Sequence, residues 1–578
     1  MSPTLVGGRT AIALSVLSGL LYFLAFPGIG LWPIAFFALV PLMVALEGRA
    51  LRPALGLGWI TGFVMTVTGF YWLVEMLRVF SGFPTALCLL FAVLLCLYQG
   101  ATMAVVGGFT ARLTERRWPF GLAFSLGFVV SELVFPVLFR WYFGASVHSV
   151  WPLVQIADLG GPITISLTLV AVNLALFGAV RARLKRQRLN WNKSVALLCV
   201  PVLAIGYGLI RAHFVDRAAA EAPHATVGLV QANMSLLGKR HDLREGLRRH
   251  LRLTKHLLAN HPLDLVVWSE TSVMRAVDED RIAKEVPRVV GRHIGTNAIF
   301  GAVLVRPVDD SRGYVFFNSA LATDRKGVLR GRYDKHYLLA FGEYLPFGDT
   351  FPILYDWSPN SGRFSAGKSL DPLPIEGHPV ATIICYEDLS PSFVNSLFRH
   401  EDAQLLVNMT NDAWFGKTTE PYSHFALAKL RAVEQRRYFV RSTNSGVSGV
   451  IDPVGRTLVR SKIFRQATLE ADVAWMSGST VYRVLGDLPW WLATAAAAIL
   501  LFVRRKVRPG ATAPSTVAEE PATSAEEPAT SAEEPQVPIE TPPPPASPAA
   551  PADTSPESGL AQPIEGPYFP PVDRKPDD

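Results

Sequence analysis

The sequence predicts an integral membrane protein in which a multi-span α-helical domain of eight helices carries a layered α/β domain. The chain has 578 residues, 50% of them hydrophobic, and a mean hydropathy of +0.26. It is too apolar for an ordinary soluble protein and too long for one domain. The apolar residues gather in long segments, and a polar region with strand-like and helical runs lies before the last of them. These observations favour membrane spans flanking a folded polar domain.

Eight apolar segments are candidates for membrane spans, because about 20 apolar residues cross a bilayer core. They are 10–26, 30–46, 54–77, 83–107, 118–139, 163–180, 195–210 and 485–503. The first segment lacks a convincing small-residue cleavage site and other spans follow it closely, so we interpret it as an uncleaved span. We therefore expect helices 1–7 within residues 1–211 and helix 8 at 485–503.

The distribution of basic residues predicts the orientation of these spans. Clusters of Arg and Lys follow the second, fourth, sixth and eighth segments, whereas the alternate connections hold chiefly Arg78 and Arg140. By the positive-inside rule, the basic connections and both termini are cytoplasmic, and residues 212–484 lie outside the cytoplasm. The net charge of +7 largely reflects these flanking residues, so we expect no nucleic-acid partner.

Residues 212–484 alternate strand-like apolar runs with helical stretches, which indicates an α/β domain large enough to bury its own core. Helical spacing with mixed charge appears at Leu243–Leu258 and Phe425–Arg437. The expected strands are Thr226–Val230, Leu265–Trp268, Ala298–Val305, Ser319–Thr323, Val328–Asp334, Val380–Ile384, Leu405–Asn408 and Val447–Ile451.

Two other stretches have a distinct composition. The connection 140–162 carries Trp141, Tyr142, Phe143 and Trp151, which fit an aromatic belt at the membrane interface or a lipid portal. Of the two we expect the belt. Residues 504–578 begin with a basic cluster and then consist mainly of Pro, Ala, Glu, Ser and Thr. Such a composition cannot bury enough apolar surface to offset its ordering entropy, so we expect a disordered cytoplasmic tail.

Cys385 is the only cysteine outside the apolar segments, and it ends the predicted strand Val380–Ile384. It therefore has no disulfide partner within its own domain, which is expected to face the oxidising side of the membrane. A free cysteine can be a buried inert thiol. Its position at a strand end, beside the acidic residues Glu387 and Asp388, favours a nucleophile.

Two more polar residues follow predicted strands: Glu270 comes after Leu265–Ser269, and Lys335 after Val328–Asp334. In layered α/β proteins, strand ends bring together side chains from distant parts of the chain. A carboxylate can take the proton of a thiol, and a lysine can lower the thiol pKa and stabilise an oxyanion. Each residue could equally be a surface charge. The spacing alone leaves both interpretations open.

The motifs around these residues resemble the nitrilase (carbon–nitrogen hydrolase) superfamily and, within it, the apolipoprotein N-acyltransferase family. The resemblance extends over roughly residues 10–505, includes the eight spans, and excludes the tail. It rests on Trp268–Thr271, Tyr333–Leu338, Phe341–Gly348, Cys385–Asp388, Asn408–Gly416, His424–Glu434 and Arg441–Gly446.

The resemblance implies a nitrilase-like αββα sandwich at 212–484 and a role for each motif residue. Cys385 would be the nucleophile, Glu270 the general base and Lys335 the oxyanion stabiliser, with Glu343 and Glu387 as supporting carboxylates. Cys385 would take an acyl chain from a phospholipid as a thioester. The α-amine of S-diacylglyceryl-cysteine, at the N-terminus of an apolipoprotein, would then accept it.

The resemblance also implies a location and a set of partners. The protein would lie in the bacterial cytoplasmic (inner) membrane, with its catalytic domain on the periplasmic side. We expect a monomer that uses no cofactor. The histidines lack zinc-ligand spacing, so we expect no metal either.

Three residues depart from the family pattern. Ser269 and Ala340 stand where proline is common, and Arg240 stands near the place of a common tryptophan. The first two departures concern loop rigidity. The third concerns how a loop contacts lipid.

A competing motif lies at Gly362–Ser369, which matches the Walker A pattern. A phosphate loop needs a strand before it and a helix after it, whose N-terminus holds the phosphates. Pro359 precedes the segment, and Pro372 and Pro374 follow it. We therefore expect no phosphate loop.

Two alternative functions are a membrane-bound nitrilase-type amidase with a soluble substrate, and a non-catalytic lipid-binding or transport protein. A tether for an amidase needs one span rather than eight. Transport paths usually contain ionisable residues within the membrane, and here Glu132 is the main one. Both alternatives are therefore less favoured than acyl transfer.

Overall fold

The computed structural model describes residues 3–234, 243–308, 313–340, 342–357 and 362–505. The tail from residue 506 onward, and with it most of the predicted segment 504–578, lies outside the described residues. So do Arg240, Phe341 and Pro359.

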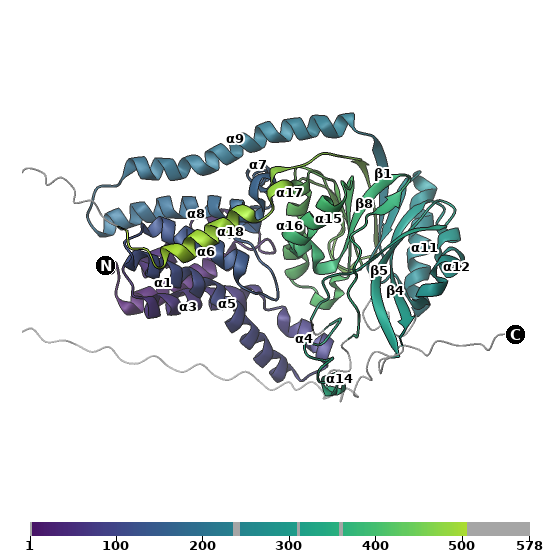
Figure 1. The fold of residues 1–578 in the computed structure, drawn as a ribbon, viewed down its shortest axis with the longest axis horizontal. Helices are drawn as coiled ribbons and strands as arrows, with labels where there is room; N and C mark the ends of the chain where they lie inside the picture. The colour runs from purple at the N-terminus through teal and green to yellow at the C-terminus, as the bar shows by residue number, and fades with distance from the viewer. Residues whose placement is uncertain (1–2, 235–242, 309–312, 341, 358–361, 506–578) are drawn as a thin grey trace, which may run out of the picture. The chain divides into compact units, whose positions relative to one another are not determined.

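The N-terminal part is helical, and one further apolar helix follows the α/β domain (Figure 1). The helices of the N-terminal part are α1 (Gly8–Leu24), η1 (Trp32–Phe36), α2 (Val40–Leu46), α3 (Leu51–Gly69), α4 (Leu73–Ser81), α5 (Thr85–Glu115), α6 (Phe120–Val134), η2 (Phe143–Val147), α7 (Trp151–Val154), α8 (Ala157–Leu184) and α9 (Trp191–Glu221). After the α/β domain come the short helix α17 (Val481–Leu485) and the apolar helix α18 (Leu488–Leu500).

Three of the described helices, α5, α8 and α9, are long and apolar enough to cross a membrane. The α3–α4 pair, bent by 58°, adds a fourth if the pair is one span. The other apolar helices, α1, η1 with α2, α6 and α18, have 10 to 17 residues. Each of the eight predicted segments therefore coincides with apolar helical structure, and three to four of them reach spanning length.

Close packing in the helical part depends on glycine. Gly62 of α3 lies so near α5 that a Cβ atom built on it would come within 2.0 Å of the Gly100 carbonyl oxygen. Small residues let apolar helices approach closely and gain dispersion energy where no water is present to drive association. The α3–α5 contact therefore requires glycine at this position.

The aromatic-belt prediction is wrong for Tyr142 and Phe143, which are buried at 6% and 0% exposure. Their connection folds back into the helical part, where the Gly144 N–H donates to Ser166 Oγ of α8 at 2.9 Å. Trp141 stacks on Phe26 with ring centroids 4.0 Å apart. These side chains form part of the helical core because the connection is not an extended surface loop.

The α/β domain contains two sheets, with seven and six strands among the described residues. The first has the order β13-β1-β2-β4-β5-β6, with β3 paired to β4, and the second the order β12-β11-β10-β9-β8-β7. The strands are β1 (His224–Gln231), β2 (Leu265–Trp268), β3 (Val273–Asp278), β4 (Asn297–Pro307), β5 (Tyr314–Thr323), β6 (Leu329–Asp334), β7 (Leu373–Ile375), β8 (His378–Ile384), β9 (Leu405–Thr410), β10 (Phe439–Thr443), β11 (Gly449–Ile451), β12 (Thr457–Arg460) and β13 (Ala467–Ala474).

The two sheets face each other across a shared core to which Val227 and Val267 of the first sheet and Ile383 and Val407 of the second contribute. Helices α11 (Leu243–Asn260) and α12 (Ile282–Val286) cover the outer face of the first sheet. Helices α15 (Pro391–His400) and α16 (Glu420–Gln435) cover the second (Figure 1). The domain is therefore an α-β-β-α sandwich. All the predicted strands and both predicted helices are present.

One buried ion pair joins the α/β domain to the helical part. Arg436, at the end of α16, donates to Asp158 of α8 at 2.7 Å and to the Gln155 side chain at 2.5 Å. Arg436 and Asp158 are 4% and 2% exposed. Separation of the two parts would leave both buried charges without a partner, which is costly. These contacts therefore hold the α/β domain on α8.

Candidate active site

The three predicted catalytic residues each follow a strand, and they come from both sheets. Glu270 follows β2 and Lys335 follows β6 in the first sheet, and Cys385 follows β8 in the second. Lys335 Nζ lies 3.6 Å from Glu270 Oε1. All three residues are buried, with exposures of 6%, 2% and 4%. The strand ends thus bring a thiol, a carboxylate and an ammonium group into one water-poor site.

Glu343 completes the carboxylate pair around the lysine. Its Oε2 lies 2.8 Å from Lys335 Nζ and also accepts the backbone N–H of Leu339 at 2.8 Å. Burial by itself lowers the pKa of Lys335, but the charges of Glu343 and Glu270 outweigh burial and raise it above its ordinary value. Lys335 therefore stays a cation at neutral pH.

Asn318 of β5 is a site residue that the sequence analysis missed. Its Nδ2 donates to Glu270 Oε1 at 2.7 Å and to Glu343 Oε1 at 2.8 Å. The backbone carbonyl oxygen of Asn318 accepts the backbone N–H of Lys335 at 2.9 Å. The only signal in the sequence is an amide, beside Ser319, inside the largely apolar run Val315–Ala322, a weak indication without knowledge of the strand pairing.

The backbone at Cys385 has a left-handed conformation, with φ of 55°, and Thr271 after Glu270 has φ of 47°. Non-glycine residues rarely adopt this region, and each instance costs of the order of 1–3 kcal/mol. Both turns direct the chain sharply away from a strand end. Such strain persists only where surrounding contacts hold it, and it is common at functional sites.

Burial raises the pKa of the Cys385 thiol well above its ordinary value, and the charge of Glu270 raises it further. Lys335 and the Thr410 hydroxyl act in the opposite direction but do not outweigh burial. The thiol is therefore neutral in the resting site. A nucleophilic attack by this sulfur needs a base that takes its proton during the attack.

Glu387 links the two strand ends that carry Lys335 and Cys385. One carboxylate oxygen accepts the backbone N–H groups of His336 and Tyr337 at 2.6 and 3.1 Å. The other accepts the Tyr333 hydroxyl at 2.8 Å and the Ile384 N–H at 2.7 Å. Burial raises the pKa of Glu387 to about 7, against these donors. Glu387 positions backbone rather than contacting the lysine ammonium directly.

A buried ionic network lies behind the Cys385 turn, and the sequence analysis assigned it no role. Arg441 of β10 donates to Asp388 and, at 3.0 Å, to Asn408 Oδ1. Asn408 Nδ2 in turn donates to the Cys385 carbonyl oxygen at 3.1 Å. His424 Nε2 lies 2.8 Å from Asp388 Oδ1. These contacts fix the backbone of the turn that carries the thiol.

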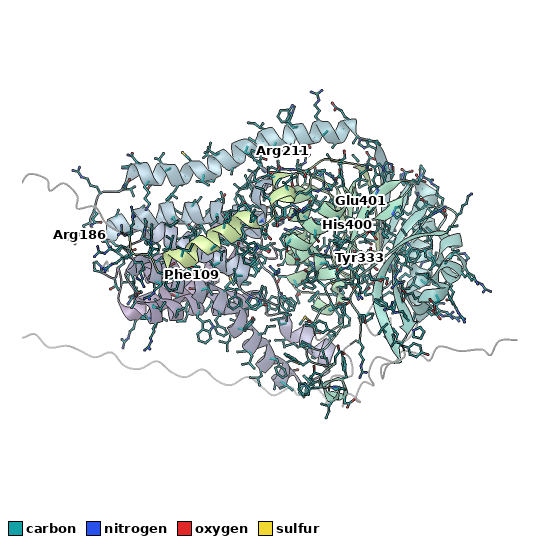
Figure 2. All side chains as sticks on the ribbon, viewed as in Figure 1. Phe109, Arg186, Arg211, Tyr333, His400 and Glu401 are labelled. Atoms are coloured by element: carbon teal, nitrogen blue, oxygen red, sulfur yellow. The ribbon has the colours of Figure 1, made fainter. Side chains whose placement is uncertain are left out.

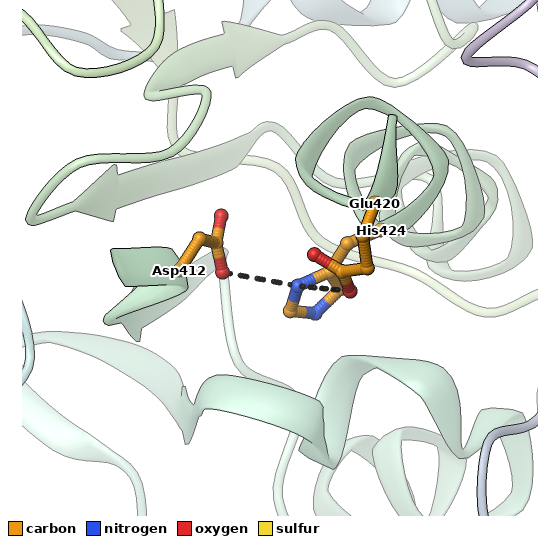
Figure 3. Close-up of side chains that lie close together, drawn as sticks. All are labelled: Asp412, Glu420 and His424. Carbon is orange, nitrogen blue, oxygen red and sulfur yellow. Dashed lines mark hydrogen bonds and ion pairs between the residues drawn. The ribbon is translucent and has the colours of Figure 1, made fainter. Parts of the chain in front are cut away.

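Asp412, Glu420 and His424 are the one group among the described residues whose ligand atoms lie close enough to hold a metal ion (Figure 3). Arg441 Nη2 lies 2.9 Å from His424 Nδ1 and 3.4 Å from Asp412 Oδ2. The guanidinium thus supplies a positive charge where a metal cation would be needed. We interpret the group as part of the ionic network and not as a metal site.

The Walker A match at Gly362–Ser369 forms no phosphate loop, which confirms the prediction. The segment is extended and no helix begins in it. The Gly367 N–H donates to the Lys335 carbonyl oxygen at 2.8 Å. A Cβ atom on Gly367 would lie 2.2 Å from the Asp334 carbonyl oxygen, so glycine is needed for this close approach. The segment supports the backbone of Lys335.

Aromatic contacts connect the site to the helical part. Tyr386, next to Cys385, packs edge-on against Phe415 and Phe139, with centroid distances of 5.6 and 5.8 Å. Trp72, beside α4, contacts both of these phenylalanines at 5.2 and 5.0 Å. An apolar cluster therefore runs from the helices to the residue beside the thiol.

Two family models match the chain: the N-terminal domain of apolipoprotein N-acyltransferase at residues 18–175, and carbon-nitrogen hydrolase at residues 226–479. The apolipoprotein N-acyltransferase of Geobacter metallireducens is 31% identical, over 86% of this chain and 96% of that protein. The chain belongs to the apolipoprotein N-acyltransferase family. The apolipoprotein N-acyltransferase of Azotobacter vinelandii is also 31% identical, over 88% of this chain and 97% of its own length.

Among solved structures, Nit3 of Saccharomyces cerevisiae, a member of the nitrilase superfamily, has a TM-score of 0.34 and 16% identity. The match covers 46% of this chain and 94% of that one.

Family membership confirms the resemblance found in the motifs. As an apolipoprotein N-acyltransferase, the protein is an enzyme of the nitrilase superfamily that N-acylates lipoproteins. Its homologues imply the bacterial inner membrane, in agreement with the several candidate spans. The amidase and transport alternatives are therefore set aside.

Proposed function

We propose that this apolipoprotein N-acyltransferase works through a thioester on Cys385, with Glu270 as general base, Lys335 as oxyanion stabiliser and a phospholipid as acyl donor. The observation that carries the proposal is the position of Lys335 Nζ, 3.6 Å from Glu270 and 2.8 Å from Glu343, in the site of a buried neutral thiol. A neutral thiol needs both a base and an electrophilic partner, and these groups supply them.

In the first step, Cys385 Sγ attacks an ester carbonyl of the phospholipid while Glu270 takes the thiol proton. The carbonyl oxygen becomes an oxyanion, which the Lys335 ammonium stabilises. The intermediate then expels the glycerol oxygen, and Glu270 returns the proton to it. The products are the Cys385 thioester and a lysophospholipid.

In the second step, the neutral α-amine of S-diacylglyceryl-cysteine attacks the thioester carbonyl. Glu270 takes a proton from the amine, and Lys335 again stabilises the oxyanion. The carbon–sulfur bond breaks, the amide forms, and the sulfur regains a proton from Glu270. The cycle ends with the neutral thiol from which it began.

Exposed apolar side chains after Lys335 support a lipid substrate. Tyr337, Phe347 and Phe351 are 55%, 76% and 57% exposed, and Ile353 is 54% exposed. Soluble surfaces rarely expose so many large apolar groups in one stretch, and such stretches mark lipid or protein contacts. With the aromatic cluster at Tyr386, they offer an apolar environment for an acyl chain on its way to Cys385.

We further propose the topology that the basic residues predict. Helices 1–7 lie in residues 1–211, the catalytic domain at 212–484 is periplasmic, helix 8 lies at 485–503, and both termini are cytoplasmic. The tail 504–578 is then separated from Cys385 by the bilayer. A catalytic domain on the outer face would meet diacylglyceryl lipoproteins where they emerge, and we propose that one copy of the chain suffices.

The test of the mechanism is the intact mass of the purified full-length enzyme after incubation with phospholipid. We expect an added acyl mass that hydroxylamine removes and that Cys385→Ser abolishes. The matched control is Cys199→Ser, because Cys199 is an exposed thiol on α9. Acylation that persists in Cys385→Ser, or that is lost in Cys199→Ser alone, would refute the assignment.

A further inference from the structure

A cavity lies at the helix ends that carry the basic residues, which the proposed topology places on the cytoplasmic side. It has a volume of about 950 Å³ and opens between the ends of α6, α8 and α9. Its basic lining residues are Arg117, Arg181, Arg188, Lys193 and Arg504. Cavities of this size fall in the range that binds drug-sized or larger ligands.

The cavity carries uncompensated positive charge. Its carboxylate Glu47 pairs with Arg181 at 2.8 Å and with Lys185 at 3.1 Å. Its other carboxylate, Glu115, pairs with Arg112. Among the described residues, Arg117, Arg188, Lys193 and Arg504 have no carboxylate partner. Four cations without counter-ions around one cavity repel one another, so the site favours an anion.

One wall of the same cavity is apolar. Leu122 and Phe120 of α6, Leu174 and Phe177 of α8, and Leu197 of α9 line it. Helix α9 also exposes apolar side chains beside the opening, among them Val195 and Leu198. A ligand that satisfies the whole cavity therefore combines an anionic head with apolar chains.

We propose that this cavity binds an anionic phospholipid, with the headgroup phosphate between Arg188, Lys193 and Arg504 and the acyl chains against α8 and α9. Basic pockets between membrane helices bind such headgroups by charge, while the chains stay in the apolar layer. The bound lipid bridges α9 to α6 and α8 and removes the repulsion among the arginines.

This lipid is not the acyl donor. The basic cluster lies at the C-terminal end of α8, where Figure 2 labels Arg186, whereas Asp158 at the other end contacts the α/β domain. Helix α8 has 28 residues, which corresponds to roughly 40 Å at about 1.5 Å per residue. A lipid held there occupies the opposite leaflet and cannot reach Cys385.

The acidic tail is the other negatively charged occupant that the chain itself offers. Its composition is mainly Pro, Ala, Glu, Ser and Thr, and large apolar residues are sparse. Such a segment can match the charges but not the wall of Leu and Phe side chains. The apolar wall therefore favours a lipid over the tail.

The experiment is native mass spectrometry of the full-length enzyme, purified with phosphatidylglycerol and phosphatidylcholine in equal amounts. We expect one phosphatidylglycerol to be retained in preference to phosphatidylcholine. The double variant Arg188→Gln, Lys193→Gln should retain it about 25-fold more weakly, because each basic residue near a membrane contributes on the order of fivefold. It should also lose the thermal stabilisation that phosphatidylglycerol gives the wild type.

The matched control is Arg183→Gln, Arg186→Gln, which removes the same charge from the same connection but from outside the cavity lining. It should retain the lipid within twofold of the wild type. Equal loss in both double variants would show diffuse surface attraction and overturn the site. Competition by millimolar inorganic phosphate would identify a free-anion site. If truncation after Arg508 raised phosphatidylglycerol retention more than tenfold, the tail would be the occupant. Competition by phosphate and this rise on truncation would each overturn the proposal as well.

Discussion

At the scale of single residues, the site depends on how two carboxylates share one lysine and one amide. Asn318 Nδ2 bridges Glu270 and Glu343, and Lys335 Nζ lies near both. The positive charge of Lys335 therefore offsets the negative charges of the two carboxylates beside it.

The first prediction concerns these two residues. Lys335→Met and Glu270→Gln should each lower the rate of acyl-enzyme formation by 10²–10³, about 2.7–4 kcal/mol, which is typical for loss of one oxyanion donor. The measurement is single-turnover acylation followed by intact mass. The matched control is Lys368→Met, outside this carboxylate cluster, which should acylate normally. Well-folded Lys335→Met or Glu270→Gln enzymes with near-normal rates would mean that other groups carry these roles.

At the scale of elements, the turn after β8 is held by charged residues of β10, of α16 and of the turns that follow β8 and β9. Arg441, Asp388, Asp412 and His424 are each at most 1% exposed. Buried charges are tolerated only when they are paired and hydrogen-bonded. The network therefore makes the position of the Cys385 turn dependent on several elements at once.

Removal of Arg441 should be strongly destabilising. Arg441→Met leaves Asp388 and Asp412 buried without their main counter-charge, a defect that typically costs 3–5 kcal/mol. We expect a large fall in the apparent melting temperature of the detergent-solubilised enzyme. Arg460→Met, which changes an exposed residue of β12, serves as the control and should cost no more than about 0.5 kcal/mol. Similar melting temperatures for the two variants would contradict the assigned role of the network.

The same network predicts a pH dependence of stability. Burial and Arg441 lower the pKa of His424, but Asp388 and Asp412 outweigh them and raise it to about 9. The unfolded value is about 6.5. The folded state therefore holds this proton more tightly, so the stability is fully present below pH 6.5 and is lost as the pH rises through 9. Burial also raises the pKa of Glu420, which acts with the same sign.

The check is the melting temperature between pH 6.5 and 9 in the wild type and in His424→Asn. The wild type should lose stability over this range, and the variant should lose less of it, although it starts from a lower value. An unchanged slope in His424→Asn would show that the proton resides elsewhere.

At the scale of the whole molecule, substrate access depends on the side of the membrane that the catalytic domain faces. Basic residues are concentrated on alternate connections of the chain, and this one charge distribution has two consequences. It places basic residues around the cavity at the ends of α6 and α8, and it underlies the periplasmic position proposed for 212–484. The buried Arg436–Asp158 pair couples the α/β domain to α8, and so ties the catalytic domain to that orientation.

This orientation predicts the behaviour of reporter fusions. Alkaline phosphatase fused within 212–484 should be active, and the same enzyme fused in the 181–193 connection should be inactive, because alkaline phosphatase folds only outside the cytoplasm. A membrane-impermeant thiol reagent should label Cys385 in spheroplasts when the site is open. The reverse pattern of fusion activities would place the thiol in the cytoplasm and refute the topology.

Local periodicity and motifs within short segments were enough to predict eight of the strands, the positions of the three strand-end residues and the family. The other features come from packing between elements that are distant in the chain. Asn318 enters the site through the register of β5 with β6, and β10 was missed because Arg441 interrupts its apolar pattern. Tyr142 and Phe143 are buried because their connection folds onto α8. Each of these depends on which distant elements pack together, and that choice minimises unpaired buried charge over the whole fold.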